Sequence, residues 1–164
     1  MGVDSDTLVS WLADYDPDNI TIGVVASHSS LQILHGARRE GFKTLGIAVG
    51  ENRRRFYKAF PGAEPDEWLM LENYREMLDH AEWFRQRNVV IIPHGSLVEY
   101  LGSSNFRELQ VPTFGNRGIL HWESSRERQR QWLEAGGCTM PKVLEDPHDI
   151  DGPVIVKYAG AKGG

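Results

Sequence analysis

The sequence has little cysteine and no long apolar run. Its single cysteine is Cys138, and one thiol excludes an internal disulfide framework and any zinc site built from several cysteines. No apolar stretch approaches the length that spans a bilayer. The opening residues, MGVDSDTLVSWLADYD, are acidic and lack the basic start and unbroken apolar stretch of a secretion signal. These absences predict a cytoplasmic protein with no membrane partner.

Positive charge is also scarce. The 164 residues include 18 lysines and arginines against 23 aspartates and glutamates, which gives a formal net charge of −5 and argues against a general nucleic-acid binder. A local cluster of donors can still hold a small anionic ligand, because the net charge does not fix the field inside one pocket. Hydrophobic residues make up 40% and charged residues 25% of the chain, which is typical of a globular protein.

Apolar runs alternate with helical patterns through the first part of the chain. The runs ITIGVVA, TLGIAVG and NVVIIP are apolar on both faces, as buried strands of a parallel sheet are, and EWLML is a shorter apolar run between the last two. Helical spacing occurs at residues 8–12, 31–40, 51–60 and 74–87, and a further helix is expected from Ser96. This alternation predicts an α/β fold with a Rossmann-like, doubly wound parallel sheet and right-handed crossovers.

The character of the chain changes after VPTFGN, residues 111–116. Residues 124–137 form a highly charged helical pattern that Ser124 or Ser125 can cap and that a double glycine ends. A turn rich in proline and aspartate follows, and residues 154–156 are expected to form a last strand. We therefore predict a boundary after Glu123, with a first domain over residues 1–123 and a second domain that begins within residues 124–164 and is not completed.

Two polar loops follow predicted strands at the positions where open α/β sheets bind ligands. One has the sequence SHSS and the other HGS, and hydroxyls, an imidazole and free N–H groups suit an anion or phosphate. The alternative is that these residues are ordinary helix caps and surface groups. It has equal weight, because serine and threonine cap helices in every fold and a histidine at a strand end is often a surface group. The candidate residues are Ser27, His28, Ser29, Ser30, His94, Gly95 and Ser96, with His94 the weaker of the two histidines.

Other chemistry has less support. The HGSLV segment lacks the second glycine of a nucleophile elbow, so Ser96 is not interpreted as a nucleophile. The remaining histidines lack the paired spacing of a metal site, and no metal bound by this chain is predicted. The basic runs at residues 53–55 and 126–130 are interpreted as solvated helix faces, and Cys138 as a small packed apolar group.

The C-terminal segment PVIVKYAGAKGG combines an apolar run, a lysine and a glycine-rich loop. Lys157 can present a fixed positive charge, and glycines let backbone N–H groups approach an oxyanion closely. This combination suits a nucleoside triphosphate, although no Walker A motif is present. A generic glycine-rich tail is the alternative. The candidate residues are Lys157, Gly160, Lys162, Gly163 and Gly164.

Together, the SHSSLQIL stretch, the HGS loop, FGNRGILHWESSRERQRQWLEAGG and PVIVKYAGAKGG closely resemble the archaeal formate-dependent FAICAR synthetases, which are ATP-grasp ligases of purine biosynthesis. The resemblance runs over nearly the whole chain. It implies a pre-ATP-grasp domain that binds 5-aminoimidazole-4-carboxamide ribonucleotide (AICAR), followed by the start of an ATP-grasp domain.

The resemblance also implies a reaction and its sites. ATP and Mg²⁺ activate formate as formyl phosphate, and the AICAR amine then attacks the formyl carbon to give FAICAR. AICAR binding falls on His28 and Ser96, with Ser27, Ser29, Ser30 and Gly95 as possible contributors. ATP binding falls on Lys157, Gly160, Lys162, Gly163 and Gly164. The magnesium ligands are expected beyond residue 164 and the catalytic residues are not assigned, so these 164 residues alone are expected to be inactive.

Two further interpretations remain open. The chain could be a non-catalytic ribonucleotide-binding module that retains the SHSS and HGS loops. It could instead belong to an ATP-grasp ligase for another acid and amine, since many ligases share the ATP loop. The sequence also leaves open whether the protein forms a homo-oligomer.

Overall fold

The computed structural model describes residues 3–156 and divides the chain into two compact units, Met1–Arg117 and Gly118–Gly164. In the described residues no helix is both long and apolar enough to cross a membrane. The predicted boundary after Glu123 concerns functional domains and stays a prediction.

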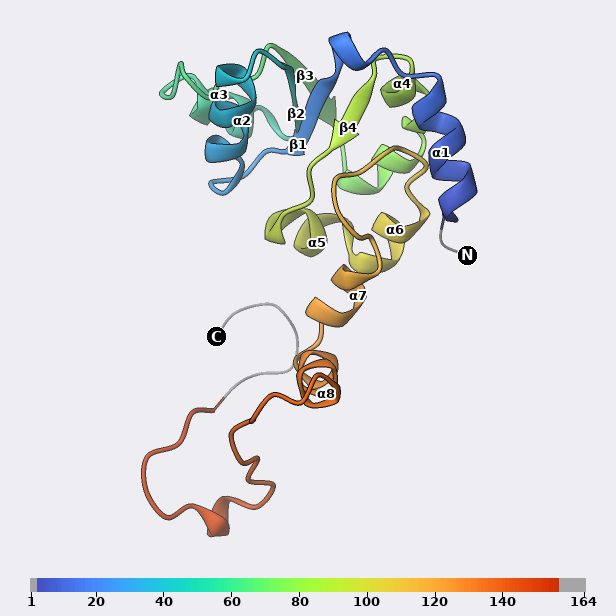
Figure 1. Cartoon of the computed structure of the whole chain (residues 1–164). Coiled ribbons are helices and arrows are strands. Elements are labelled where there is room, and N and C mark those ends of the chain that lie inside the picture. The colour runs from blue at the N-terminus through green and yellow to red at the C-terminus, as the bar shows by residue number, and fades with distance from the viewer. Residues whose placement is uncertain (1–2, 157–164) are drawn as a thin grey trace. The chain divides into compact units, whose positions relative to one another are not determined.

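A four-stranded sheet forms the centre of the first unit, in the order β3-β2-β1-β4 (Figure 1). Every pairing is parallel, with Val25 opposite Ile47 and Gly23 opposite Ile91. The strands are β1 (Thr21–Val25), β2 (Lys43–Val49), β3 (Glu67–Leu71) and β4 (Val89–Ile91). The predicted parallel sheet is therefore confirmed, and its strand order reverses direction between β1 and β4.

Helices cover both faces of this sheet. Figure 1 shows α2 (Ser30–Arg39) and α3 (Glu51–Tyr57) on one side of the strands, and α1 (Ser5–Ala13) and α4 (Ala81–Arg85) on the other. Helices on both faces explain why β1 and β2 are almost wholly buried and read as continuous apolar runs. The doubly wound arrangement is the one that the sequence predicts.

The core beneath α2 and α3 combines small strand residues with larger helical ones. Val24 of β1, Ala48 of β2 and Ala26, which directly follows β1, pack with Leu34 and Tyr57. All five residues are 0% exposed. A Cβ atom added to Gly46 would come within 2.7 Å of Pro65 and Trp68, so β2 needs glycine where the loop before β3 crosses it. This packing holds α3 against the sheet and thereby positions Tyr57, the last residue of α3.

The region between β3 and β4 differs from the prediction. A single helix was expected over residues 74–87, but the chain forms the 3₁₀ helix η2 (Tyr74–Leu78) and the separate short helix α4. The side chain of Asn73 accepts from the Arg75 N–H, and a ring nitrogen of His80 lies 2.9 Å from the Glu76 carbonyl. These local bonds compete with a continuous α-helical ladder, so the prediction of one long helix is wrong.

The segment after β4 completes the first unit. The helices α5 (Gly95–Leu101) and α6 (Ser103–Glu108) are followed by a bridge in which Thr113 pairs parallel with Ile91 of β4. Arg117 braces this segment, because its guanidinium donates to the Thr113 hydroxyl at 3.0 Å and to the carbonyl of Val111. Burial lowers the pKa of Arg117 to about 10, which leaves the side chain charged at neutral pH.

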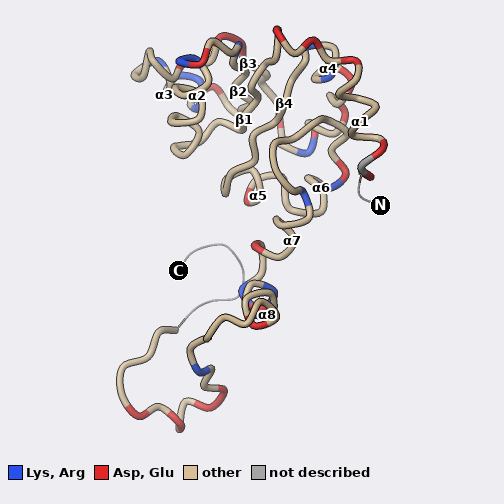
Figure 2. Tube along the Cα trace, in the orientation of Figure 1, with Lys and Arg blue, Asp and Glu red and all other residues tan. Residues whose placement is uncertain are grey.

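The second unit contains the helices α7 (Ile119–Glu123) and α8 (Arg126–Ala135) and the 3₁₀ helix η3 (Pro147–Asp149). Ser125 caps α8 as predicted, with its side chain accepting from the Arg128 N–H. No residue of α8 is buried, and Figure 2 shows charges of both signs on it. The prediction of a solvated helix is confirmed here.

The predicted last strand is not observed. Residues 153–156 have no regular secondary structure, and Ile155 and Val156 are 84% and 81% exposed. A strand is stable only when a neighbour pairs with its N–H and C=O groups. Within the described residues no segment pairs with residues 154–156, so their apolar, β-branched character alone does not make them a strand.

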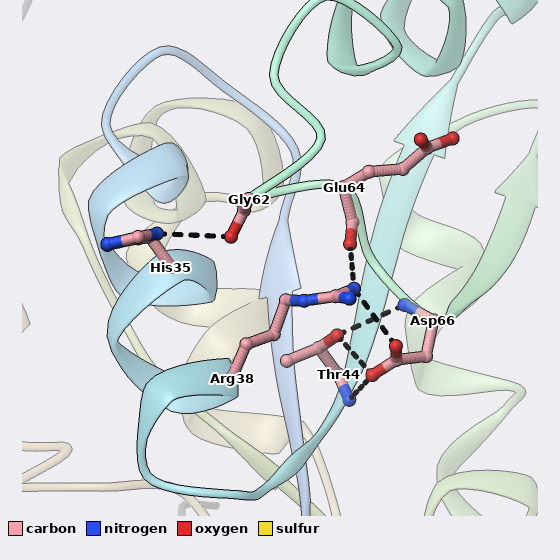
Figure 3. Close-up of polar contacts among 6 residues, drawn as sticks. All are labelled: His35, Arg38, Thr44, Gly62, Glu64 and Asp66. Carbon is pink, nitrogen blue, oxygen red and sulfur yellow. Dashed lines mark hydrogen bonds and ion pairs between the residues drawn. The ribbon is translucent and has the colours of Figure 1, made fainter.

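A polar cluster closes the amino end of the sheet (Figure 3). Asp66, which directly precedes β3, accepts from the Thr44 N–H at 2.9 Å and from the Thr44 hydroxyl at 2.7 Å. Arg38 of α2 donates to Asp66 at 3.0 Å and to the Glu64 carbonyl at 2.6 Å. The cluster thus connects α2, β2 and the start of β3 to one another at the amino end of the strands, opposite the end that carries the SHSS and HGS loops.

Replacing Asp66 with alanine should lower the free energy of unfolding by about 1–3 kcal/mol, because the N–H of Thr44, a residue only 1% exposed, would lose its acceptor. Urea denaturation measures the change. The control is Glu67→Gln, which removes an exposed ion pair to Arg87 at 3.7 Å and should cost no more than about 1 kcal/mol. Equal losses in the two variants would contradict this role of Asp66.

Candidate functional site

The sheet brings the SHSS and HGS loops to one place. Because β1 and β4 are parallel neighbours, the loops at their carboxyl ends emerge side by side where the strand order reverses. The ring of His94 links them directly, since its Nε2 lies 2.9 Å from the carbonyl oxygen of Val25 at the end of β1. His28 and His94 are 66 positions apart in the sequence, but the fold brings them to the same end of the sheet.

Two of the serines in the SHSS loop shape the loop itself. The N–H of Ser27 donates to the Ser30 hydroxyl at 2.8 Å and to the Tyr57 hydroxyl at 3.0 Å. The carbonyl of Ser27 accepts in turn from Ser30 at 2.8 Å and from Tyr57 at 2.6 Å. Ser27 and Ser30 are 2% and 0% exposed, so their polar groups are satisfied inside the protein.

The other two residues of this loop are more accessible. His28 is exposed and Ser29 is half-buried, and neither side chain makes a hydrogen bond within residues 3–156. The N–H of Ser29 donates to the Ser27 hydroxyl at 3.2 Å, which holds the backbone of the loop. The geometry therefore leaves His28 and Ser29 as the members of this loop that can reach a ligand.

Tyr57 is a residue that the sequence interpretation missed. It comes from the end of α3, is 0% exposed, and its hydroxyl contacts three polar atoms of the SHSS loop. Burial raises the pKa of Tyr57, so the hydroxyl stays protonated and remains a donor at neutral pH. No local pattern identifies this role, because it depends on a contact between residues 30 positions apart.

The ring of His94 has a defined tautomer and charge. The Val25 carbonyl can only accept a hydrogen bond, so Nε2 carries the proton. Burial lowers the pKa of His94, and the neighbouring His28 lowers it slightly further, while the bond to Val25 opposes both effects. The ring is consequently neutral at neutral pH, and its buried Nδ1 has no hydrogen-bond partner among the described residues. The lower weight given to His94 as a ligand-binding residue stays a prediction.

Ser96 and Gly95 form the remaining edge of the site. Ser96 is 8% exposed, and its hydroxyl makes no hydrogen bond within residues 3–156. Gly95 is exposed, and a Cβ atom added there would meet nothing within 4 Å. The backbone at Gly95 thus borders open space, beside a hydroxyl that a ligand can engage.

Arg53 corrects the interpretation of residues 53–55 as a solvated helix face. Arg54 and Arg55 are exposed, but Arg53 is half-buried. Its Nη2 donates to the Tyr100 hydroxyl at 2.8 Å, and its Nη1 reaches the carbonyl of Ala26 at 3.4 Å. The guanidinium therefore lies between the SHSS loop and α5, next to the candidate site.

The predicted ATP-binding residues cannot be placed in the same way. Lys157, Gly160, Lys162, Gly163 and Gly164 lie outside the described residues. Across residues 3–156, no group of three or more histidine, cysteine, aspartate or glutamate side chains is arranged to hold a metal ion.

Comparison with protein families gives one match over most of the chain. Residues 22–144 match the family described as "Protein of unknown function (DUF1246)". This range includes all of the sheet except Thr21, both polar loops and α8.

Curated relatives carry a specific name. The chain is 57% identical over 157 residues to the "5-formaminoimidazole-4-carboxamide-1-(beta)-D-ribofuranosyl 5'-monophosphate synthetase 1" of Methanosarcina mazei and 56% identical over 157 residues to the corresponding synthetase of Methanosarcina barkeri. Each match covers 96% of this chain and 44% of the relative. The resemblance to archaeal FAICAR synthetases is thus confirmed, and the chain spans about 44% of these relatives' length.

A solved structure shares the fold. The crystal structure of N5-carboxyaminoimidazole synthetase from Staphylococcus aureus matches with a TM-score of 0.58 and 14% sequence identity, over 75% of this chain and 32% of that one. The predicted α/β, Rossmann-like fold class is confirmed by this match and by the four-stranded parallel sheet.

The neutral, buried state of His94 predicts a pH dependence of stability. A histidine whose pKa is lowered on folding binds a proton more tightly when unfolded, so its contribution is present above the unfolded value of about 6.5 and is lost as the pH falls through the lower folded value. We expect the free energy of unfolding to fall between pH 7 and pH 5 less steeply in His94→Gln than in the wild type. Urea denaturation across this range measures both slopes.

The control for this experiment is His148→Gln, which replaces an exposed histidine of η3 in the second unit. Wild-type behaviour of His94→Gln at every pH would contradict the assigned neutral state.

Proposed function

This chain belongs to the DUF1246 family, and we propose that it is the AICAR-binding N-terminal part of an ATP- and formate-dependent ligase that converts AICAR to FAICAR in purine biosynthesis. The observation that carries the proposal is the hydrogen bond from His94 to Val25, which unites the SHSS and HGS loops at one edge of the sheet. The names of the relatives support the choice of ligand.

The chemistry of the site fits binding of a ribonucleotide. The side chains of His28, Ser29 and Ser96 make no hydrogen bond within residues 3–156, and the backbone at Gly95 allows close approach. Hydroxyl and imidazole groups of this kind bind ribose and phosphate oxygens by hydrogen bonds. Ser27 and Ser30 act indirectly, since they fix the loop that presents His28.

The proposed role of this part in the reaction is positioning. Formate is a poor electrophile, and ATP, when bound, supplies the phosphoryl group that makes it reactive. The amine of AICAR must then meet the activated carbon in a defined geometry, and holding two reactants in place can contribute several kcal/mol to lowering the barrier. The SHSS and HGS loops would hold AICAR so that its amine is presented to that carbon.

Other parts of the proposal rest on the resemblance alone. Residues 1–123 would form the pre-ATP-grasp domain, and residues 124–164 would begin the ATP-grasp domain. Lys157, Gly160, Lys162, Gly163 and Gly164 would contact ATP. Mg²⁺ would accompany ATP as a cofactor. The proposed location is the cytoplasm, and the proposed substrates are AICAR, formate and ATP.

Replacing His28 or Ser96 with alanine should weaken AICAR binding by about 10-fold or more, because each change removes a hydrogen bond to a polar or charged ligand group. Isothermal titration calorimetry measures the affinity. The controls are His148→Ala and Ser104→Ala, which make the same changes at exposed positions of η3 and α6. Unchanged affinity in both site variants would remove these loops from the binding site.

The 164-residue chain should bind AICAR without catalysing its formylation. We expect no formate-dependent release of ADP from this chain, and ADP release from a longer native product if one is found by intact mass. In that product Lys157→Ala should raise the ATP concentration needed for activity. Full activity of the 164-residue chain would contradict the proposal that this part binds AICAR but does not catalyse the reaction alone. A native product of 18.6 kDa that binds AICAR would instead favour a non-catalytic binding module.

A further inference from the structure

Arg53 is held beside the candidate site by two contacts from different elements. Its guanidinium reaches the Ala26 carbonyl at the end of β1 and donates to the Tyr100 hydroxyl of α5. It also lies over the Tyr100 ring, with 5.1 Å from Cζ to the ring centroid. The ring of Tyr100 is in turn stacked on that of Tyr74, with centroids 5.0 Å apart. The charge is thus fixed in place before any ligand arrives.

Arg53 has no acidic partner among residues 3–156. The ion pairs within residues 3–156 involve other arginines: Arg38 with Asp66, Arg54 with Glu51, Arg87 with Glu67 and Arg130 with Glu134. In a chain with a net charge of −5, a half-buried arginine that contacts only a carbonyl and a tyrosine carries an uncompensated positive charge.

The position of this charge relative to Ser96 follows from helix geometry. Ser96 and Tyr100 are four residues apart on α5, so they share one face of that helix. A long helical side chain leans toward the N-terminus of its helix, which directs the Tyr100 ring toward the turn that contains Ser96. Arg53, bonded to the Tyr100 hydroxyl, therefore lies on the side of α5 that presents Ser96 and faces the SHSS loop through Ala26.

We propose that Arg53 binds the 5′-phosphate of the ribonucleotide held by the SHSS and HGS loops. This inference rests on the proposed function and adds to it the residue that recognises the phosphate. Guanidinium has five N–H donors in a planar fork that matches phosphate oxygens, and the bonds of Arg53 to Ala26 and Tyr100 leave donors for a ligand. Because the side chain is already held by Ala26 and Tyr100, little conformational freedom is lost when the phosphate binds.

The test compares two ligands that differ only in the phosphate. Isothermal titration calorimetry measures binding of AICAR and of its nucleoside, which lacks the 5′-phosphate, to the wild type and to Arg53→Gln. We expect Arg53→Gln to weaken AICAR binding by about 10- to 100-fold, the range for a hydrogen bond to a charged group. Binding of the nucleoside should change by less than about 2-fold, because it has no phosphate for Arg53 to contact.

Matched variants separate this role from a structural one. Arg54→Gln makes the same change one residue away, at an exposed position, and should leave both affinities unaltered. Tyr100→Phe keeps the aromatic ring but removes the hydroxyl that orients Arg53, so it should weaken AICAR binding several-fold with no effect on the nucleoside. If Arg53→Gln does not fold, Arg53→Lys, which keeps the charge and loses the fork, replaces it and should show the same ligand selectivity to a smaller extent.

Each other outcome has a distinct meaning. Equal weakening of both ligands by Arg53→Gln would show that Arg53 supports the loops, and it would overturn phosphate recognition while leaving the proposed function intact. Unaltered AICAR affinity, or equal affinity of the wild type for the two ligands, would also overturn it. A wild-type chain that binds neither ligand would overturn the ribonucleotide site itself and, with it, this role of Arg53.

Discussion

The hydrogen bond between the His94 ring and the Val25 carbonyl is the interaction on which the site depends. This bond lies between the carboxyl ends of β1 and β4, where the strand order of the sheet reverses. The parallel pairing of these strands brings the two loops near each other, but parallel pairing fixes only the strands. The imidazole fixes the loops, because it joins the start of α5 to the last residue of β1.

A second constraint comes from the buried hydroxyl groups. Tyr57 and Ser30 satisfy the N–H and C=O of Ser27, so the turn after β1 is held by the protein rather than by a ligand. Buried polar groups are costly unless they are hydrogen-bonded, and here the bonds come from the loop itself and from α3. The consequence is a loop whose shape is set in advance, with His28 left at its surface.

The sequence predicts the strands of this protein well and its long-range contacts poorly. β1 and β2 are recognisable because helices on both faces make them apolar throughout. The roles of Tyr57 and Arg53 are not recognisable, since both depend on how α3 packs against the end of β1. Residues 154–156 show the opposite error: they have the composition of a strand, but a strand also needs a neighbour, which composition does not reveal.

The charge state of the site follows from these same contacts. His94 is neutral because burial lowers its pKa, and burial raises the pKa values of Tyr57 and Tyr74. The groups that hold the site together are therefore uncharged, which avoids the large cost of removing several charges from water. Among the described residues around the two loops, Arg53 supplies a permanent charge, and its contacts with a carbonyl and a hydroxyl orient it without neutralising it. A chain with an overall negative charge can in this way present a positive field to an anionic ligand at one place.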